Sequence, residues 1–164
     1  MGLLGISLLL VGITLISNGV NRFANVDAKS TAFMNLVTGI LLITGNIIAL
    51  AKAAEIIEYQ NVASGFLFGI TYIFIAANYL FNFDLRPFGW YCLFVAAYAV
   101  VMAVSSIGDY KFVFLWSAWA VLWGEGFLEL AAGLKLAKIF PYISIAVGLF
   151  AAFIPSILML TNNW

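Results

Sequence analysis

Six apolar segments, separated by short polar connections, are the feature that most constrains how this chain can fold. Each is about as long as one helical crossing of a bilayer, because a hydrocarbon core about 30 Å thick takes roughly 20 helical residues. The segments cover about residues 3–20, 30–51, 62–82, 88–107, 112–133 and 140–160. We therefore predict an all-α integral membrane protein, a six-transmembrane-helix bundle that forms a single domain over residues 1–164.

The composition agrees with a multi-pass membrane protein and excludes several functional classes. Hydrophobic residues make up 65% of the chain and charged residues 9%, with a mean hydropathy of +1.12, which a soluble core of this size could not use. The basic and acidic residues balance, and no basic cluster could bind nucleic acid. Histidine is absent and Cys92 is the only cysteine, so the usual metal ligands are missing. We expect no cofactor and no metal, and a protein that is not an enzyme.

The basic residues predict how the helices are oriented in the membrane. Five of the seven lie in the first, third and fifth connections: Arg22, Lys29, Arg86, Lys135 and Lys138. Only Lys52 and Lys111 lie in the second and fourth connections. By the positive-inside rule, the odd connections are cytoplasmic and both termini lie outside.

A line of aromatic residues in the fifth segment, here called the tryptophan stripe, shares one helical face. Trp116, Trp119 and Trp123 are separated by three and four residues, and Phe112, four residues earlier, extends this face. Lipid-facing tryptophans belong at the membrane interface, whereas these three span about 10 Å along a helix. One interpretation is packing against neighbouring helices. The other is a narrow, mostly apolar slot with a few N–H donors, which suits a small, flat, neutral polar solute better than an ion.

Two carboxylates in the same segment lie on a second face. Leu122, Glu125 and Glu129 are three and four residues apart, on a face rotated well away from the tryptophans. An ionised carboxylate at mid-membrane costs about 2.5–3.5 kcal/mol, so Glu125 and Glu129 should face protein, water or a positive charge. They are candidate polar or pH-sensitive residues. We expect Glu129 near the cytoplasmic end of its helix, within reach of Lys135 or a helix N-terminus.

These carboxylates leave two other functions open. One is a proton-coupled small-solute carrier or a membrane enzyme that uses Glu125 and Glu129, although either needs a further titratable or metal-binding group. The other is a packing subunit or membrane sensor that transports nothing.

Polar residues and a proline inside the segments carry further expectations. Four asparagines are predicted to form hydrogen bonds between helices or to cap them, with a polar path as the alternative: Asn18, Asn35, Asn46 and Asn78. Small residues such as Gly39, Gly65 and Gly69 allow helix backbones to approach closely. Pro155 should bend the sixth helix or free a carbonyl there.

Several blocks of sequence resemble the AmiS/UreI family, in the same order along nearly the whole chain. They are L-I-S-N-G (15–19), V-D-A-K-S-T-A-F-M-N (26–35), G-F-L-F-G-I-T-Y (65–72), R-P-F-G-W-Y-C-L-F-V-A (86–96) and W-S-A-W-A-V-L-W (116–123). The resemblance implies a six-helix channel of the bacterial cytoplasmic (inner) membrane for urea and short aliphatic amides, with both termini outside. It also implies a homo-hexameric ring surrounded by membrane lipid, with one pore in each protomer, and a cytoplasmic amidase or urease as the metabolic partner.

The family's pore-lining residues can be matched to this sequence position by position. Its W-x-x-W-x-x-L-W pattern corresponds to Trp116, Trp119, Leu122 and Trp123, and the aliphatic residues of its first helix correspond to Leu4, Leu8, Val11 and Leu15. Its paired aromatics of the third helix fall at Ile70 and Phe74, so one ring has become aliphatic and a phenol has lost its hydroxyl. The resemblance therefore implies a pore compatible with slightly larger amides, closer to the amide-channel branch than to the acid-gated urea channels.

Two further departures from the family concern gating. Its acid-activated urea channels carry histidines and acids in long outer loops, and a glutamate on the sixth helix. This chain has short connections there, no histidine, and Val147, a further pore-lining candidate, at the position of that glutamate. We therefore predict a passive channel that mild acid does not open. Glu125, an extra carboxylate relative to the acid-gated branch, is the residue that could still confer pH dependence.

Overall fold

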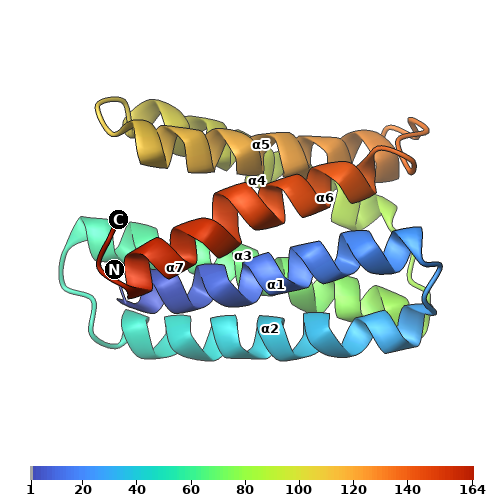
Figure 1. The fold of residues 1–164 in the computed structure, drawn as a ribbon, viewed down its shortest axis with the longest axis horizontal. Helices are drawn as coiled ribbons and strands as arrows, with labels where there is room; N and C mark the ends of the chain where they lie inside the picture. The colour runs from blue at the N-terminus through green and yellow to red at the C-terminus, as the bar shows by residue number, and fades with distance from the viewer. Residues whose placement is uncertain (1) are drawn as a thin grey trace.

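The computed structural model describes residues 2–164, which form a bundle of helices with no β-strand in that range (Figure 1). The helices are α1 (Gly2–Phe23), α2 (Ala28–Leu50), α3 (Ile56–Phe81), α4 (Arg86–Ser105), α5 (Tyr110–Leu130) and α6 (Phe140–Gly148), which continues through a π-helical turn, η1 (Leu149–Phe153), into α7 (Ile154–Leu160). Their positions match the six predicted segments. The largest difference is the start of α3, which begins at Ile56 and not at 62, because Glu58 accepts hydrogen bonds from the N–H groups of Ala54 and Glu55 at 2.8 and 3.1 Å.

Five of the described helical segments are long and apolar enough to cross a membrane: α1, α2, α3, α4 and the continuous segment Phe140–Leu160. The helix α5 is as long as these, with 21 residues. Its tryptophans and glutamates lower its mean hydropathy, so it is not among the five. The three tryptophans and one of the two glutamates are buried, namely Trp116, Trp119, Trp123 and Glu125. A helix of this kind enters a membrane with its polar groups shielded by neighbouring helices.

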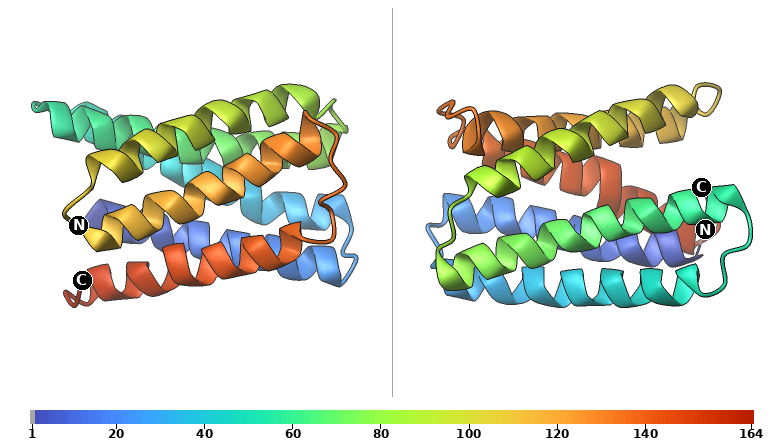
Figure 2. Two further views of the ribbon diagram at one scale, coloured as in Figure 1. Left: turned by 90° about the horizontal axis from the view of Figure 1, so that it is seen from above. Right: turned by 180° about the vertical axis from the view of Figure 1, so that it is seen from behind.

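Successive helices run in opposite directions, so the connections alternate between the two ends of the bundle. The N- and C-termini lie at one end, together with the α2–α3 and α4–α5 connections (Figures 1 and 2). The α1–α2, α3–α4 and α5–α6 connections lie at the other end, which therefore carries five of the seven basic residues. The alternation required by the predicted topology is present. Which end faces the cytoplasm still depends on the positive-inside rule and stays a prediction.

The helices pack as close pairs, α2 with α3, α4 with α5, and α1 with α6 and α7. Glycines lie where the backbones of a pair approach each other. A Cβ atom on Gly39 of α2 would lie 2.8 Å from the side chain of Ile73 on α3, and one on Gly65 of α3 would overlap the side chain of Asn46. The predicted role of these glycines is confirmed.

Polar side chains inside the bundle bond to one another and to backbone carbonyl groups. Asn18 of α1 and Asn35 of α2 exchange two amide hydrogen bonds, at 2.9 and 2.8 Å. One turn away, the hydroxyl groups of Thr14 and Thr38 lie 2.7 Å apart. The prediction that the asparagines join helices is therefore confirmed for this pair. Asn46 instead donates to the carbonyl of Leu42 in its own helix, at 2.7 Å.

Pro155 lies in the first turn of α7, directly after the π-helical turn η1. A π-helical turn places one extra residue in a helix, and it is a common way to accommodate a residue that cannot donate a backbone hydrogen bond. The N–H of Ile154 donates to the carbonyl of Leu149, five residues earlier. The predicted local distortion of the sixth membrane segment is confirmed, and it takes the form of a widened turn.

The contact between α1 and η1 can be tested with a minimal substitution. A Cβ atom on Gly12 would lie 2.6 Å from the backbone nitrogen of Phe153, which cannot move without shifting η1. We expect Gly12→Ala to destabilise the protein by about 1–3 kcal/mol, as overpacking does, measured as a lower midpoint of thermal unfolding in detergent. Gly124→Ala is the matched control, because a Cβ atom there meets nothing within 4 Å. Equal midpoints for the wild type and Gly12→Ala would contradict the tight packing.

Candidate functional site

A cavity of about 450 Å³ opens at the end of the bundle that carries the α1–α2, α3–α4 and α5–α6 connections. Residues from α1 to α6 line it, among them Leu15, Asn18, Phe68, Trp123, Glu125 and Glu129. We call this cavity the vestibule. Its lining is mostly apolar, and polar residues occur at both depths. Asn21, Arg22 and Glu129 lie near the helix ends, and Asn18, Thr71 and Glu125 lie deeper.

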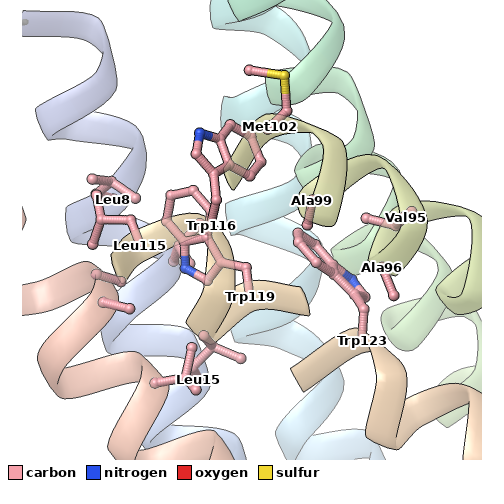
Figure 3. Close-up of a cluster of buried hydrophobic side chains, with 14 of the residues drawn as sticks. Leu8, Leu15, Val95, Ala96, Ala99, Met102, Leu115, Trp116, Trp119 and Trp123 are labelled. Carbon is pink, nitrogen blue, oxygen red and sulfur yellow. The ribbon is translucent and has the colours of Figure 1, made fainter. Parts of the chain in front are cut away.

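Aromatic rings form the inner end of the vestibule. Phe68 of α3 lies edge to face with both Trp119 and Trp123 of α5, with ring centroids 4.8 Å apart in each case. Trp116 and Trp119 also meet edge to face, at 5.0 Å. Figure 3 shows the three indole rings in the interior, with Leu8 and Leu15 of α1 on one side and Ala96 and Ala99 of α4 on the other. We call Phe68 and the three tryptophans the aromatic cluster.

The aromatic cluster is closed in this structure. Its tryptophan side chains are 3–8% exposed, and of the three only Trp123 lines the vestibule. The rings of the tryptophan stripe fill the interior beyond the vestibule, and their predicted role as the wall of a slot stays a prediction. At the far end of the stripe, Phe112 packs edge to face against Trp164 at 6.0 Å. The indole N–H of Trp119 is buried and donates to no group in residues 2–164.

The structure brings together only some of the other predicted pore-lining residues. Leu8, Val11, Leu15 and Val147 are buried in the core, Leu4 is partly buried against it, and of these only Leu15 lines the vestibule, as does Leu122 of α5. Ile70 does not face the vestibule, since its side chain is 41% exposed. Phe74 stacks on Phe88 of α4, at 4.8 Å. The residue of α3 that meets the tryptophans is thus Phe68, which the sequence comparison did not single out.

Glu129 forms an ion pair that differs from the predicted one. Its carboxylate accepts a hydrogen bond from Arg22 of α1 at 2.8 Å, whereas Lys135 or a helix N-terminus was expected. The expectation was wrong because it considered only groups close in sequence, and Arg22 reaches Glu129 across the bundle. Arg22 also lies over the ring of Phe140, with 4.7 Å between the guanidinium carbon and the ring centroid. This cluster joins α1, α5 and α6 at the opening of the vestibule.

Glu125 lies one turn deeper than Glu129 and has no such partner. Its side chain is 5% exposed, and neither carboxylate oxygen accepts a hydrogen bond from the part of the chain that the structure describes. Glu125 and Trp123 both line the vestibule, so the carboxylate face and the tryptophan face of α5 are less separate than the sequence indicated. The two faces meet at one cavity.

Comparison with known proteins identifies the family. The sequence matches the AmiS/UreI family of transporters over residues 3–163. The chain belongs to this family. Its fold is similar to the cryoEM structure of the Helicobacter pylori urea channel in closed state, with a TM-score of 0.90 and 36% identity over 98% of this chain and 99% of that one. A crystal structure of the urea channel from Helicobacter pylori gives a TM-score of 0.86, at 37% identity and the same coverage.

Sequence relatives of this AmiS/UreI family member include urea and amide transport proteins. An acid-activated urea channel of Helicobacter pylori is 34% identical, over 99% of this chain and all of its own length. A putative amidate substrates transporter protein of Mycolicibacterium smegmatis is 29% identical, over 98% of this chain and 78% of its own. A putative transporter protein AmiS2 of Rhodococcus erythropolis is 33% identical, over 97% of this chain and 80% of its own length. The protein is thus a transport protein of the bacterial cytoplasmic membrane and not an enzyme.

Several vestibule residues of this AmiS/UreI family member were missed by the sequence reasoning. Arg22 was used only as a topology signal, and Cys92, which is buried, was not expected at a cavity, although both line the vestibule. One signal was available for Arg22, since a basic and an acidic residue at helix ends on the same side of the membrane are natural partners. Within residues 2–164, no group of three potential metal ligands occurs.

Proposed function

We propose that this protein is a passive channel that conducts urea and short-chain aliphatic amides through a pore inside each protomer. The observation that carries the proposal is the vestibule, which narrows to a cluster of aromatic rings in a chain related along its whole length to a urea channel and to amide transporters. The solute enters the vestibule among polar side chains and passes between the rings toward the opposite end of the bundle.

The physical chemistry of the aromatic cluster favours flat, neutral solutes. An ion would lose its hydration shell among these rings and find few groups to replace it, which is costly in a low-dielectric interior. A planar amide can lie against a ring face and exchange water for a few hydrogen bonds, such as one from the unpaired N–H of Trp119. Because the rings are in contact in this structure, passage requires some of them to rotate.

The proposed pore consists of residues predicted from the sequence and of Phe68, which only the structure points to. Its wall consists of Trp116, Trp119, Leu122 and Trp123 from α5, Leu4, Leu8, Val11 and Leu15 from α1, and Val147 from α6, with Phe68 from α3. Ile70 and Phe74 keep the proposed role only if α3 turns relative to its position in this structure. With α3 turned in this way, the loss of a ring at Ile70 relative to the family pattern supports a preference for amides slightly larger than urea.

We also propose that mild acid does not open this channel. Histidine, whose ordinary pKa falls in the range of mild acid, is absent. A side-chain hydrogen bond from Arg86 lowers the pKa of Asp84 to about 2, and hydrogen bonds from Ser30 lower the pKa of Asp27. The alignment with the acid-activated channel spans 194 positions, whereas this chain has 164 residues, so the relative carries insertions that are missing here.

The assembly and the metabolic context follow from the family resemblance. We propose a homo-hexamer in the lipid bilayer, with a cytoplasmic amidase or urease consuming the imported solute. Exposed apolar residues on α2, α3 and α4, such as Phe33, Ile48 and Phe94, provide surface for lipid and for neighbouring protomers. The vestibule end carries the majority of the basic residues, so the vestibule opens toward the cytoplasm in this proposal.

A proton-coupled carrier is the second candidate, and one observation favours it. Glu125 is a buried carboxylate without a hydrogen-bond partner among the described residues, and intramembrane carboxylates often carry protons in transporters. A carrier needs alternating access and a proton gradient, whereas a channel needs neither.

The first prediction separates the channel from the carrier. In proteoliposomes, we expect urea and acetamide to enter much faster than into empty vesicles, with rates that rise linearly with solute concentration. Shrinkage and reswelling followed by light scattering in a stopped-flow instrument measures this flux. No flux above empty vesicles would contradict the proposed function. Saturation at low concentration or dependence on a pH gradient would favour the carrier.

A second prediction concerns the aromatic cluster. We expect Trp119→Ala and Trp123→Ala to change the urea flux and the ratio of urea to glycerol flux by about tenfold, since removing a ring that contacts the solute removes a contact of about 1 kcal/mol or more and widens the pore. Trp90→Ala is the matched control, because Trp90 is 53% exposed on α4 and packs against Phe127. Similar effects from all three substitutions would mean that the rings serve packing alone.

A third prediction concerns pH. Between about pH 7.5 and about pH 5, we expect the urea flux to change by less than about twofold, since no histidine titrates in this range. The ion pair of Asp84 with Arg86 stabilises the fold above the ordinary pKa of 3.8 and is lost only as the pH falls toward about 2. The same flux assay at both pH values, with equal pH on the two sides, tests this. A severalfold increase at acid pH would show that the channel is gated.

A further inference from the structure

Glu125 is the strongest unexplained feature of the vestibule. Glu125 is only 5% exposed, and it lines the cavity. Neither of its carboxylate oxygens has a hydrogen-bond partner in residues 2–164. A buried carboxylate without partners is costly and uncommon, because buried polar atoms are nearly always paired. Its neighbour Glu129 is paired with Arg22 at 2.8 Å, which leaves that guanidinium already engaged.

We propose that Glu125 receives the amino groups of the solute and is a specificity-determining residue of the pore. This inference rests on the proposed channel function. It assigns Glu125 the role of the acceptor at the inner end of the vestibule, immediately before the aromatic cluster. The carboxylate holds a solute that carries N–H groups while the nearby rings select its flat shape.

The position of Glu125 on α5 suits this role. At 100° per residue, Glu125 and Trp123 lie at opposite edges of the helical face that borders the vestibule, with Leu122 and Gly126 between them. A Cβ atom on Gly126 would lie 3.1 Å from the sulfur of Cys92, so Cys92 of α4 packs against this glycine. The solute therefore reaches Glu125 from the vestibule, beside Cys92 and Leu122, which line the same cavity.

The chemistry of a carboxylate decides which solutes it favours. Its two oxygens accept hydrogen bonds, and charge-assisted pairs with two parallel N–H donors are the strongest of this kind. Urea can present one N–H from each of its two nitrogens, and acetamide can present two from one nitrogen. Acetate has almost the same shape as acetamide, but it has no N–H donor and would leave the oxygens of Glu125 unpaired. Glu125 therefore favours amides over the corresponding carboxylates, and over glycerol, whose hydroxyl donors are not held parallel.

Other charged and titratable groups on the vestibule do not replace Glu125. Arg22 and Glu129 form their own pair at the opening, Tyr72 and Tyr79 of α3 each carry a phenol, and Cys92 carries a weakly polar thiol. Among the described residues on this cavity, only Glu125 offers a carboxylate whose two oxygens are both free to accept hydrogen bonds.

The flux ratio of urea to glycerol tests the role of Glu125 in proteoliposomes. We expect Glu125→Leu to lower this ratio by about tenfold, as expected for the loss of a hydrogen bond to the solute. Glu125→Gln keeps one amide oxygen and should lower it by about threefold. Glycerol flux should be kept in both variants, which shows that the pore is folded. Asp109→Asn, which removes a carboxylate at the opposite end of α5 while keeping an N-cap residue, should leave the ratio unchanged.

A binding measurement separates this inference from the channel function. Cys92 is the only cysteine and lines the vestibule, so a small thiol reagent reports access to the cavity. Urea or guanidinium, added at concentrations below those that denature, should slow the modification of Cys92 severalfold in the wild type and not in Glu125→Leu. An unchanged flux ratio and unchanged protection in Glu125→Leu would overturn the role of Glu125 while leaving the channel intact. Protection without any solute flux in the wild type would support the binding role and contradict the channel.

Discussion

Aromatic side chains between closely packed helix pairs are the constraint on which the rest of this structure depends. Within a pair, glycines such as Gly39 let the backbones touch, whereas α3 and α5 meet through Phe68 and the tryptophans. An indole is too large to allow two backbones to come together, so these rings set the spacing between the pairs. This spacing leaves the vestibule open at one end of the bundle, and the aromatic rings fill the interior beyond it.

Features that depend on local spacing could be predicted from the sequence, and features that depend on distant partners could not. The six helices follow from segment length, and the shared face of Trp116, Trp119 and Trp123 follows from a period of 3.6 residues. The contact of Phe68 with two of these rings depends on how α3 is rotated. The partner of Glu129 is Arg22, 107 residues away, and no local pattern points to it. The family pattern gives Ile70 and Phe74 as pore-lining residues, and in this structure neither lines the vestibule.

Most polar groups inside the bundle have a hydrogen-bond partner, so the few that have none are informative. Asn18 with Asn35 and Thr14 with Thr38 form hydrogen bonds across the interface of α1 and α2. The unpaired buried atoms of the described side chains are the indole nitrogen of Trp119 and the two oxygens of Glu125. One is a donor and the other two are acceptors, and all belong to α5 at or just beyond the inner end of the vestibule. Natural proteins tolerate such local costs mainly where a ligand is recognised.

The vestibule occupies one end of the bundle only, and this asymmetry limits what the protein can do with its solute. In a pore without an energy source, the forward and reverse fluxes at equilibrium must be equal along every step, however different the two mouths are. A passive pore therefore cannot accumulate solute against its gradient, wherever its vestibule lies. The one-sided vestibule can make the flux saturate at different solute concentrations from the two sides, and it decides from which side a blocking molecule must enter. In the proposed channel, net inward flow continues only while the solute is consumed inside the cell.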